Sequence, residues 1–83
     1  MSPTATRVVK KRASAREVLA ENLLAIRREK GLSQDVLAAE AGLHRTFVAH
    51  LERNARNPSL DNVERIARAL GVELHVLLTP RRK

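Results

Sequence analysis

Short stretches of apolar residues at helical spacing constrain the fold of this chain more than any other feature of its sequence. In the first stretch, Leu19, Leu23 and Ile26 recur every three or four residues, which is the period of one face of an α-helix. The glycines of the chain follow three of these stretches and can end helices in the left-handed conformation, at Gly31, Gly42 and Gly71. No stretch alternates apolar and polar residues as a half-buried strand does. The sequence therefore predicts an all-α protein built from several short helices.

Serine residues mark where three of these helices begin. Ser14 and Glu17 fit a capping box, in which each side chain accepts a hydrogen bond from the backbone N–H of the other residue. Ser33 and Ser59 precede two further apolar stretches and are predicted N-caps. Asn54 tolerates a positive φ and closes the helix that follows the turn at residues 42–43. The other predicted helices cover residues 15–30, 34–41, 60–70 and 73–78.

The length of 83 residues fits a single small domain. We expect a compact core at residues 14–78, between a flexible basic N-terminal arm at 1–13 and a basic C-terminal tail at 79–83. A core of this size is marginal, so association with a partner or a second copy would add stability. The first residues carry charge with no apolar run behind them, and neither a signal peptide nor a membrane span is predicted. A cytoplasmic protein is expected.

Enzymatic or metal chemistry is not indicated by the residues present. The chain has no cysteine, which excludes disulfides and thiolate ligands. His44 and His50 are six residues apart and His75 lies in another predicted helix, so their spacing does not suggest a metal site. Three of the four serines are explained as helix caps rather than nucleophiles. We therefore expect no catalytic activity, no cofactor and no metal.

The formal net charge of +7 is concentrated at the two ends of the chain. The first 16 residues carry five Lys and Arg and no acid, the last three are all basic, and the rest is close to neutral. Basic arms beside a helical core are typical of nucleic-acid binders, although they could also be solubilising tails. No predicted helix combines a basic face with aromatic anchors, which argues against a membrane surface. The arm residues expected to contact DNA are Arg7, Lys10, Lys11 and Arg12.

The segment GLHRTFVAHLER, residues 42–53, has two different faces if it is helical. Its apolar positions follow helical spacing, which places Phe47, the only aromatic residue of the chain, in the core rather than against a base. An α-helix fits the major groove of DNA, where arginine pairs with guanine and the methyl groups of Thr or Ala meet thymine. A plain solvated face is the alternative for the polar side of this helix, which carries His44, Arg45, Thr46, Ala49, His50 and Arg53.

The stretch LSQDVLAAEAGLHRTFVAHLERNARNPSLDNVERIARALGVEL resembles the Cro/CI-type, or XRE-type, helix-turn-helix regulators. The similarity spans about residues 15–78 and includes Ala38 where two helices cross, Gly42 at the turn, and apolar residues at the buried positions. It implies a compact five-helix, lambda-repressor-like DNA-binding domain whose helix-turn-helix is formed by the second and third helices. The third helix, about residues 45–53, is then the recognition helix that enters the major groove.

The resemblance also implies roles for individual residues. Those that face base edges are Arg45, Thr46, Ala49 and His50. Those that hold the DNA backbone are Gln34, His44, Arg53, Arg56 and Asn57. A buried ion pair is implied between Arg27 and Glu52, and the alternative for Glu52 is an exposed pairing with Arg53 or Arg56. His44 departs from the usual Ser or Thr and is expected to be a weak cap or a phosphate contact.

The function implied by the resemblance is that of a sequence-specific double-stranded DNA-binding transcriptional regulator, either repressor or activator. Because one short recognition helix makes few base contacts, we expect a homodimer on a palindromic operator whose half-sites lie about one helical turn apart. The alternatives are an antitoxin or adaptor module whose main partner is another protein, or a restriction-modification controller protein. The residues expected at the dimer interface, unless they close the core of the monomer, are Leu74, Leu77 and Leu78.

Overall fold

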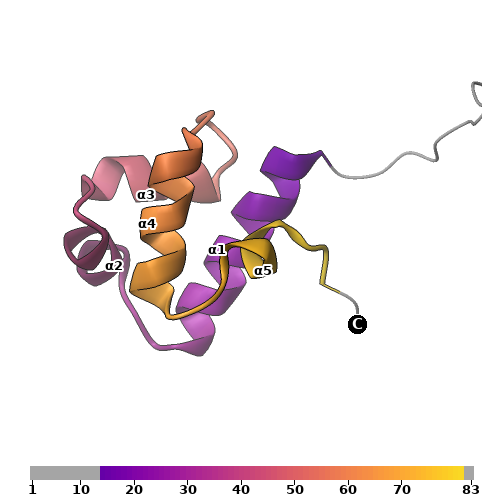
Figure 1. The fold of residues 1–83 in the computed structure, drawn as a ribbon. Helices are drawn as coiled ribbons and strands as arrows, with labels where there is room; N and C mark the ends of the chain where they lie inside the picture. Colours follow the sequence, from indigo (N-terminus) through magenta and orange to yellow (C-terminus); the bar gives the residue numbers. More distant parts are fainter. Residues whose placement is uncertain (1–13, 82–83) are drawn as a thin grey trace, which may run out of the picture.

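The computed structural model describes residues 14–81, which form five α-helices around one core (Figure 1). The helices are α1 (Ala15–Glu29), α2 (Gln34–Ala41), α3 (Arg45–Glu52), α4 (Leu60–Leu70) and α5 (Leu74–Leu78). Figure 1 shows α2 and α3 together at one end of the molecule, while α5 packs against α1 at the other side. The predicted all-α, five-helix fold is confirmed. Between residues 14 and 81, none of the helices has both the length and the apolar character that crossing a membrane requires.

The helix starts agree with the serine signals in the sequence. Glu17 donates its backbone N–H to Ser14 Oγ at 3.1 Å, and Ser14 donates its own N–H to Glu17 Oε1 at 2.7 Å, which completes the capping box. Ser33 and Ser59 each accept a hydrogen bond from the backbone of the first turn of the helix that they precede. These three helix starts are therefore capped by residues next to them in the chain, without any tertiary contact.

Every helix contributes to the one core, which is built mainly from aliphatic side chains. The most deeply buried of these are Leu23 of α1, Leu37 of α2, Val48 of α3, Ile66 and Leu70 of α4, and Leu77 of α5. Helices of five to eight residues are too short to be stable in isolation. The packing of the core therefore supplies most of the stability of α2, α3 and α5.

Helix α5 is held in place by an asparagine from α1. Asn22 is the most deeply buried polar residue among residues 14–81, with only 2% of its surface exposed. Its Nδ2 donates to the carbonyl oxygens of Leu77 and Thr79, both at 2.9 Å, and to that of Val76 at 3.3 Å. The N-cap Glu73 makes no side-chain capping hydrogen bond. The position of α5 is thus decided by Asn22 and by apolar packing rather than by local signals.

One of the three leucines expected at a dimer interface lies inside the monomer. Leu77 is 0% exposed and belongs to the core, so the expectation that it contacts a second copy is wrong. Leu74 is partly buried against the same core, and Leu78 remains 39% exposed. Helix α5 has only five residues, and Leu77 is the one that packs into the core of the monomer.

The basic arm predicted at residues 1–13, with Arg7, Lys10, Lys11 and Arg12, lies outside the described residues. Arg82 and Lys83 of the predicted tail also lie outside them. Arg81 is described, and its Nη2 lies 2.6 Å from Glu29 Oε2 at the end of α1.

Candidate nucleic-acid interface

A tight turn joins α2 to α3 and sets the angle between them. Gly42 adopts the left-handed conformation, with φ 72° and ψ 32°. Its backbone N–H and that of Leu43 donate to carbonyl oxygens near the end of α2, among them that of Ala38 at 2.9 Å from Leu43 N. Ala38 itself is buried in the core. The predicted helix-turn-helix arrangement of α2 and α3 is present in the structure.

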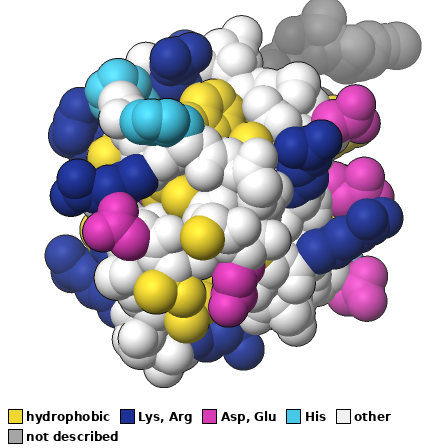
Figure 2. All heavy atoms as spheres, turned by 90° about the vertical axis from the view of Figure 1, so that its left-hand side faces the viewer, with side chains coloured by type: hydrophobic (Ala, Val, Ile, Leu, Met, Phe, Trp, Pro, Cys, Tyr) yellow, Lys and Arg dark blue, Asp and Glu magenta, His cyan; other side chains and the backbone are white. Residues whose placement is uncertain are grey.

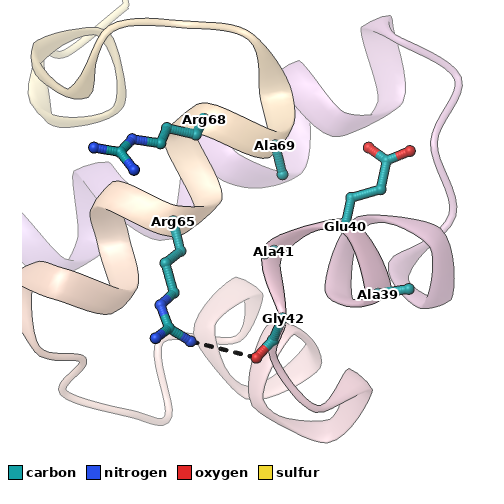
Figure 3. Close-up of a pocket in the computed structure, with 7 residues that line it drawn as sticks. All are labelled: Ala39, Glu40, Ala41, Gly42, Arg65, Arg68 and Ala69. Carbon is teal, nitrogen blue, oxygen red and sulfur yellow. Dashed lines mark hydrogen bonds between the residues drawn. The ribbon is translucent and has the colours of Figure 1, made fainter.

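Helix α4 supports this turn from outside. Arg65 of α4 reaches toward the turn, and its Nη1 donates to the carbonyl oxygen of Gly42 at 3.5 Å (Figure 3). An open hollow of about 590 Å³ lies between α2 and α4, and the residues that line it, among them Ala39 and Ala69, are labelled in Figure 3. A Cβ at Gly42 would meet Arg65 Nη1 only at 3.7 Å, so the positive φ, rather than a lack of space, favours glycine here.

A single carboxylate at the end of α3 ties three helices together. Glu52 accepts from Arg27 of α1, with distances of 2.5 Å for Nε–Oε2 and 3.0 Å for Nη2–Oε1. Gln34, the first residue of α2, donates its Nε2 to Glu52 Oε1 at 2.9 Å. The hydrogen bond with Glu52 raises the pKa of Arg27, against the opposing effect of burial. The implied Arg27–Glu52 ion pair is confirmed, and only 12% and 5% of the two side chains are exposed.

The side chain of Gln34 is engaged in this network and not free to contact a phosphate as expected. The resemblance implied that Gln34 contacts a phosphate, whereas its amide donates to Glu52 in the structure. The backbone N–H of a first helical residue has no partner within the helix and remains able to meet an anion. The phosphate contact at Gln34 therefore stays a prediction. Its donor would be the backbone N–H rather than the side-chain amide.

Helix α3 has one buried face and one open face, as its sequence predicts. Val48 and Leu51 lie in the core, and Phe47 packs partly buried against it. Arg45 and Thr46 are exposed on the first turn. Ala49 and His50 are half-buried on the next turn. The four residues expected to read bases thus lie outside the core of the domain.

His44 is the N-cap of α3. Its Nδ1 accepts the backbone N–H of Thr46 at 3.2 Å, so the expected capping role is confirmed. A ring nitrogen that accepts a hydrogen bond carries no proton, and the neutral imidazole then has its N–H at Nε2. This assignment leaves His44 a donor for a phosphate oxygen while it caps the helix.

The loop after α3 carries the residues predicted to hold the DNA backbone. Arg53 is the C-cap of α3, and Asn54 follows with φ 57°, as its tolerance of positive φ predicts. Arg56 and Asn57 are both exposed. The Arg56 guanidinium lies 5.6 Å from the centre of the Phe47 ring, a cation–π contact that the sequence pattern did not indicate. This contact places a positive charge beside Phe47, in the first turn of α3.

An acidic residue of α2 lies beside Arg45, the first residue of α3, although the first turn of α3 itself contains no acidic residue. Asp35 of α2 approaches Arg45, with Oδ1 3.2 Å from Nε. The two residues are ten positions apart on different helices, so neither spacing nor periodicity brings them together in the sequence. Figure 2 looks onto this end of the molecule, where Lys, Arg and His side chains gather along one edge with an acidic side chain among them.

A separate apolar surface lies beside α5. Leu60, the first residue of α4, is 67% exposed, and Leu78 at the end of α5 is also exposed. Both line a hollow of about 270 Å³. Its apolar lining residues include Leu19, Pro58, Leu60, Val63 and Leu78. Helical spacing groups Leu60 with the buried residues Val63 and Ile66 of α4, so periodicity alone does not show that it is exposed.

Comparison with known proteins matches residues 23–77 to the helix-turn-helix family. A hypothetical transcription factor of Neisseria meningitidis serogroup B is 48% identical over 65 residues, which are 78% of this chain and 61% of the relative. Control protein C.BamHI of Bacillus amyloliquefaciens is 50% identical over 50 residues, which are 60% of this chain and 62% of the relative. The chain thus spans about six tenths of the length of these two curated relatives.

A solved structure is also similar to this fold. The restriction-modification controller protein C.Esp1396I was determined as a tetramer in complex with its natural 35 base-pair operator. It is 32% identical to this chain with a TM-score of 0.72, and the match covers 80% of this chain and 87% of that one.

Proposed function

Because the chain belongs to the Cro/CI-type, or XRE-type, helix-turn-helix family, we propose that it is a sequence-specific DNA-binding transcriptional regulator. The observation that carries this proposal is the division of α3 into two faces. Val48 and Leu51 hold the helix to the core, while Arg45 and Thr46 are exposed on its first turn. A helix anchored in this way can enter the major groove without losing its place in the domain.

The base contacts follow from the side chains on the open face of α3. Arg45 can donate two hydrogen bonds to O6 and N7 of a guanine. Thr46 and Ala49 offer methyl groups to thymine, and His50 adds a ring nitrogen on the second turn. The proposed base-reading residues are therefore Arg45, Thr46, Ala49 and His50.

Contacts to the phosphate backbone flank this helix on both sides. His44 can donate from Nε2, and the backbone N–H of Gln34 lies at the positive end of α2. On the other side, the loop after α3 provides the exposed polar and basic groups of Arg53, Arg56 and Asn57. These contacts set the register of the protein on DNA and supply affinity that depends on salt.

The apolar surface at Leu60 and Leu78 supports a homodimer. Two exposed leucines beside a hollow are a place where a second copy could bury apolar area that the small core leaves open. The proposed interface is therefore formed by the start of α4 and the end of α5 of each copy. Its contact residues include Leu60 and Leu78 but not Leu77. A two-fold dimer would present two α3 helices to a palindromic operator.

A more specific role is that of a controller in a restriction-modification system. This role is supported by the likeness to control protein C.BamHI and to the restriction-modification controller C.Esp1396I. Genes for a methyltransferase and an endonuclease beside the gene for this chain would support it, and their absence would favour a free-standing regulator.

Selection from a pool of random DNA duplexes tests the proposed function. The full chain should enrich a palindromic sequence, and binding to that sequence should fall steeply as salt rises, because phosphate contacts release counterions. The bound complex should contain two chains per palindrome in sedimentation measurements. Failure to enrich any sequence would overturn DNA reading and favour a module whose main partner is another protein.

A further inference from the structure

The ion pair between Arg45 and Asp35 joins the first residue of α3 to the first turn of α2. Asp35 Oδ1 lies 3.2 Å from Arg45 Nε, and the two side chains are 63% (Arg45) and 72% (Asp35) exposed. An exposed pair of this kind contributes little to the stability of a free protein. The pair can nevertheless affect how Arg45 meets a base, because water leaves the groove on binding.

The closest contact of the pair lies at Nε, on the side of the Arg45 guanidinium rather than at its end. The carboxylate engages the guanidinium from the side, at Nε. The two terminal nitrogens, Nη1 and Nη2, are the pair of donors that a guanine accepts through O6 and N7. A carboxylate at Nε restricts the rotation of the planar group and does not itself occupy the two terminal donors at this closest contact. Ordering this long side chain in advance lowers the entropy that it loses on binding.

The same carboxylate disfavours DNA on which Arg45 has no guanine to read. Asp35 is an acid beside a helix that is to approach a polyanion, and its charge is compensated by Arg45. On a random sequence Arg45 could reach a phosphate only by leaving Asp35, and the carboxylate would then be unpaired near other phosphates. Repulsion of like charges in the partly dehydrated groove then weakens binding.

We propose that Asp35 is a positioning residue for base reading by Arg45, and that it raises specificity both by orienting the guanidinium and by penalising binding to sequences without the matching guanine. This inference rests on the proposed function. In this proposal Asp35 does not contact DNA. It acts through Arg45, by favouring the sequences in which Arg45 meets a guanine.

The substitution Asp35→Asn tests the inference in the full chain. The probes are the duplex enriched by selection, the same duplex with the base pair read by Arg45 changed, and a duplex of random sequence. Discrimination between the first two probes should fall about three- to fivefold, the range of a lost exposed ion pair. Affinity for the random duplex should rise, and its log–log salt dependence should steepen by about one phosphate contact because Arg45 is released. A role in folding alone would not raise affinity for any DNA.

Two further variants make the result decisive. Glu40→Gln removes the same charge from the far end of α2 and should leave discrimination unchanged. The double variant Asp35→Asn with Arg45→Ala should discriminate no worse at that base pair than Arg45→Ala alone, because Asp35 acts through Arg45. Thermal melts establish that each variant is folded.

The outcomes separate the inference from the proposed function. If the parent chain enriches a sequence and Arg45→Ala lowers discrimination, but Asp35→Asn does not, the inference fails while DNA reading stands. A uniform loss on all three duplexes with Asp35→Asn, or an equal effect of Glu40→Gln, also overturns it. If the parent chain enriches no sequence, the proposed function fails, and the inference fails with it.

Discussion

Arg27 on α1 and Glu52 at the end of α3 form a nearly buried ion pair joined by two hydrogen bonds of 2.5 and 3.0 Å. Arg27 also donates from Nη1 to the carbonyl oxygen of Leu32 at 2.8 Å, in the segment that leads into α2. Together with Gln34, this network fixes both helices of the helix-turn-helix to α1. The orientation of the reading face of α3 thus depends on a residue that lies at the far end of that helix.

Glu52→Ala should lower the free energy of unfolding by about 3 kcal/mol or more, because it leaves the Arg27 charge buried without its partner. Urea unfolding followed by circular dichroism measures the change. Glu64→Ala is the matched control, since it removes the same type of residue from the exposed pair with Arg68, and it should cost less than about 1 kcal/mol. Similar losses for the two variants would show that the Arg27–Glu52 pair is not what holds α3.

Asn22→Leu should lower the free energy of unfolding by about 2 kcal/mol, because the carbonyl oxygens that Asn22 Nδ2 contacts lose their donor in a buried place. Hydrogen exchange should rise first in α5, the helix that depends on these bonds. Glu21→Leu, at the exposed neighbouring position of α1, should change stability by less than about 0.5 kcal/mol. Unchanged protection of α5 in the Asn22 variant would contradict the role given to this side chain.

Arg45→Ala should cost about 1 to 3 kcal/mol of binding free energy on the selected operator and change binding to random DNA little. The physical reason is the loss of two hydrogen bonds to one base, with few phosphate contacts affected. Fluorescence anisotropy at fixed salt measures both duplexes. Arg68→Ala on α4, away from α3, serves as the control and should leave the ratio of the two affinities unchanged. Equal losses on both duplexes would remove Arg45 from base reading.

Deletion of residues 1–12 should weaken binding to operator and random DNA alike. Each lost phosphate contact reduces the log–log salt slope by about 0.9, because one fewer counterion is released. A salt titration of the shortened and full chains measures this slope. If the two slopes coincide, Arg7, Lys10, Lys11 and Arg12 do not contact the DNA backbone.

Leu60→Ser should weaken the homodimer about tenfold or more, because a largely exposed leucine would be buried against the second copy. Sedimentation equilibrium measures the monomer–dimer constant. Val36→Ser alters another exposed apolar side chain, on α2, and should leave the constant unchanged. A dimer that is insensitive to Leu60 would move the interface away from α4 and α5.

Much of the secondary structure of this protein can be predicted from residues that are close together in the sequence. The capping box at Ser14 and the left-handed turn at Gly42 need only neighbouring residues, so they are predicted correctly. Helical periodicity likewise identifies the buried face of α3, because Val48 and Leu51 must point the same way in any helix. The Arg27–Glu52 pair was implied by family resemblance rather than by pattern, and the structure contains it.

The packing of the helices decides which apolar residues are buried and which are exposed where helical periodicity does not. Apolar spacing cannot tell whether a leucine in a short terminal helix closes its own core or meets a second copy, and the structure places Leu77 inside and Leu60 outside. Asn22 had no visible role in the sequence because its acceptors are 54 to 57 residues away. Such contacts depend on how whole helices pack.

The sequence by itself predicted five helices, most of their ends to within about one residue, and which side of α3 is free. Only the tertiary structure placed Asp35 beside Arg45 and Gln34 against Glu52, since each contact joins two helices whose relative angle the core sets. The residues that form the reading face are thus a local property of the chain. The surroundings that orient them come from the packing of α1, α2 and α3.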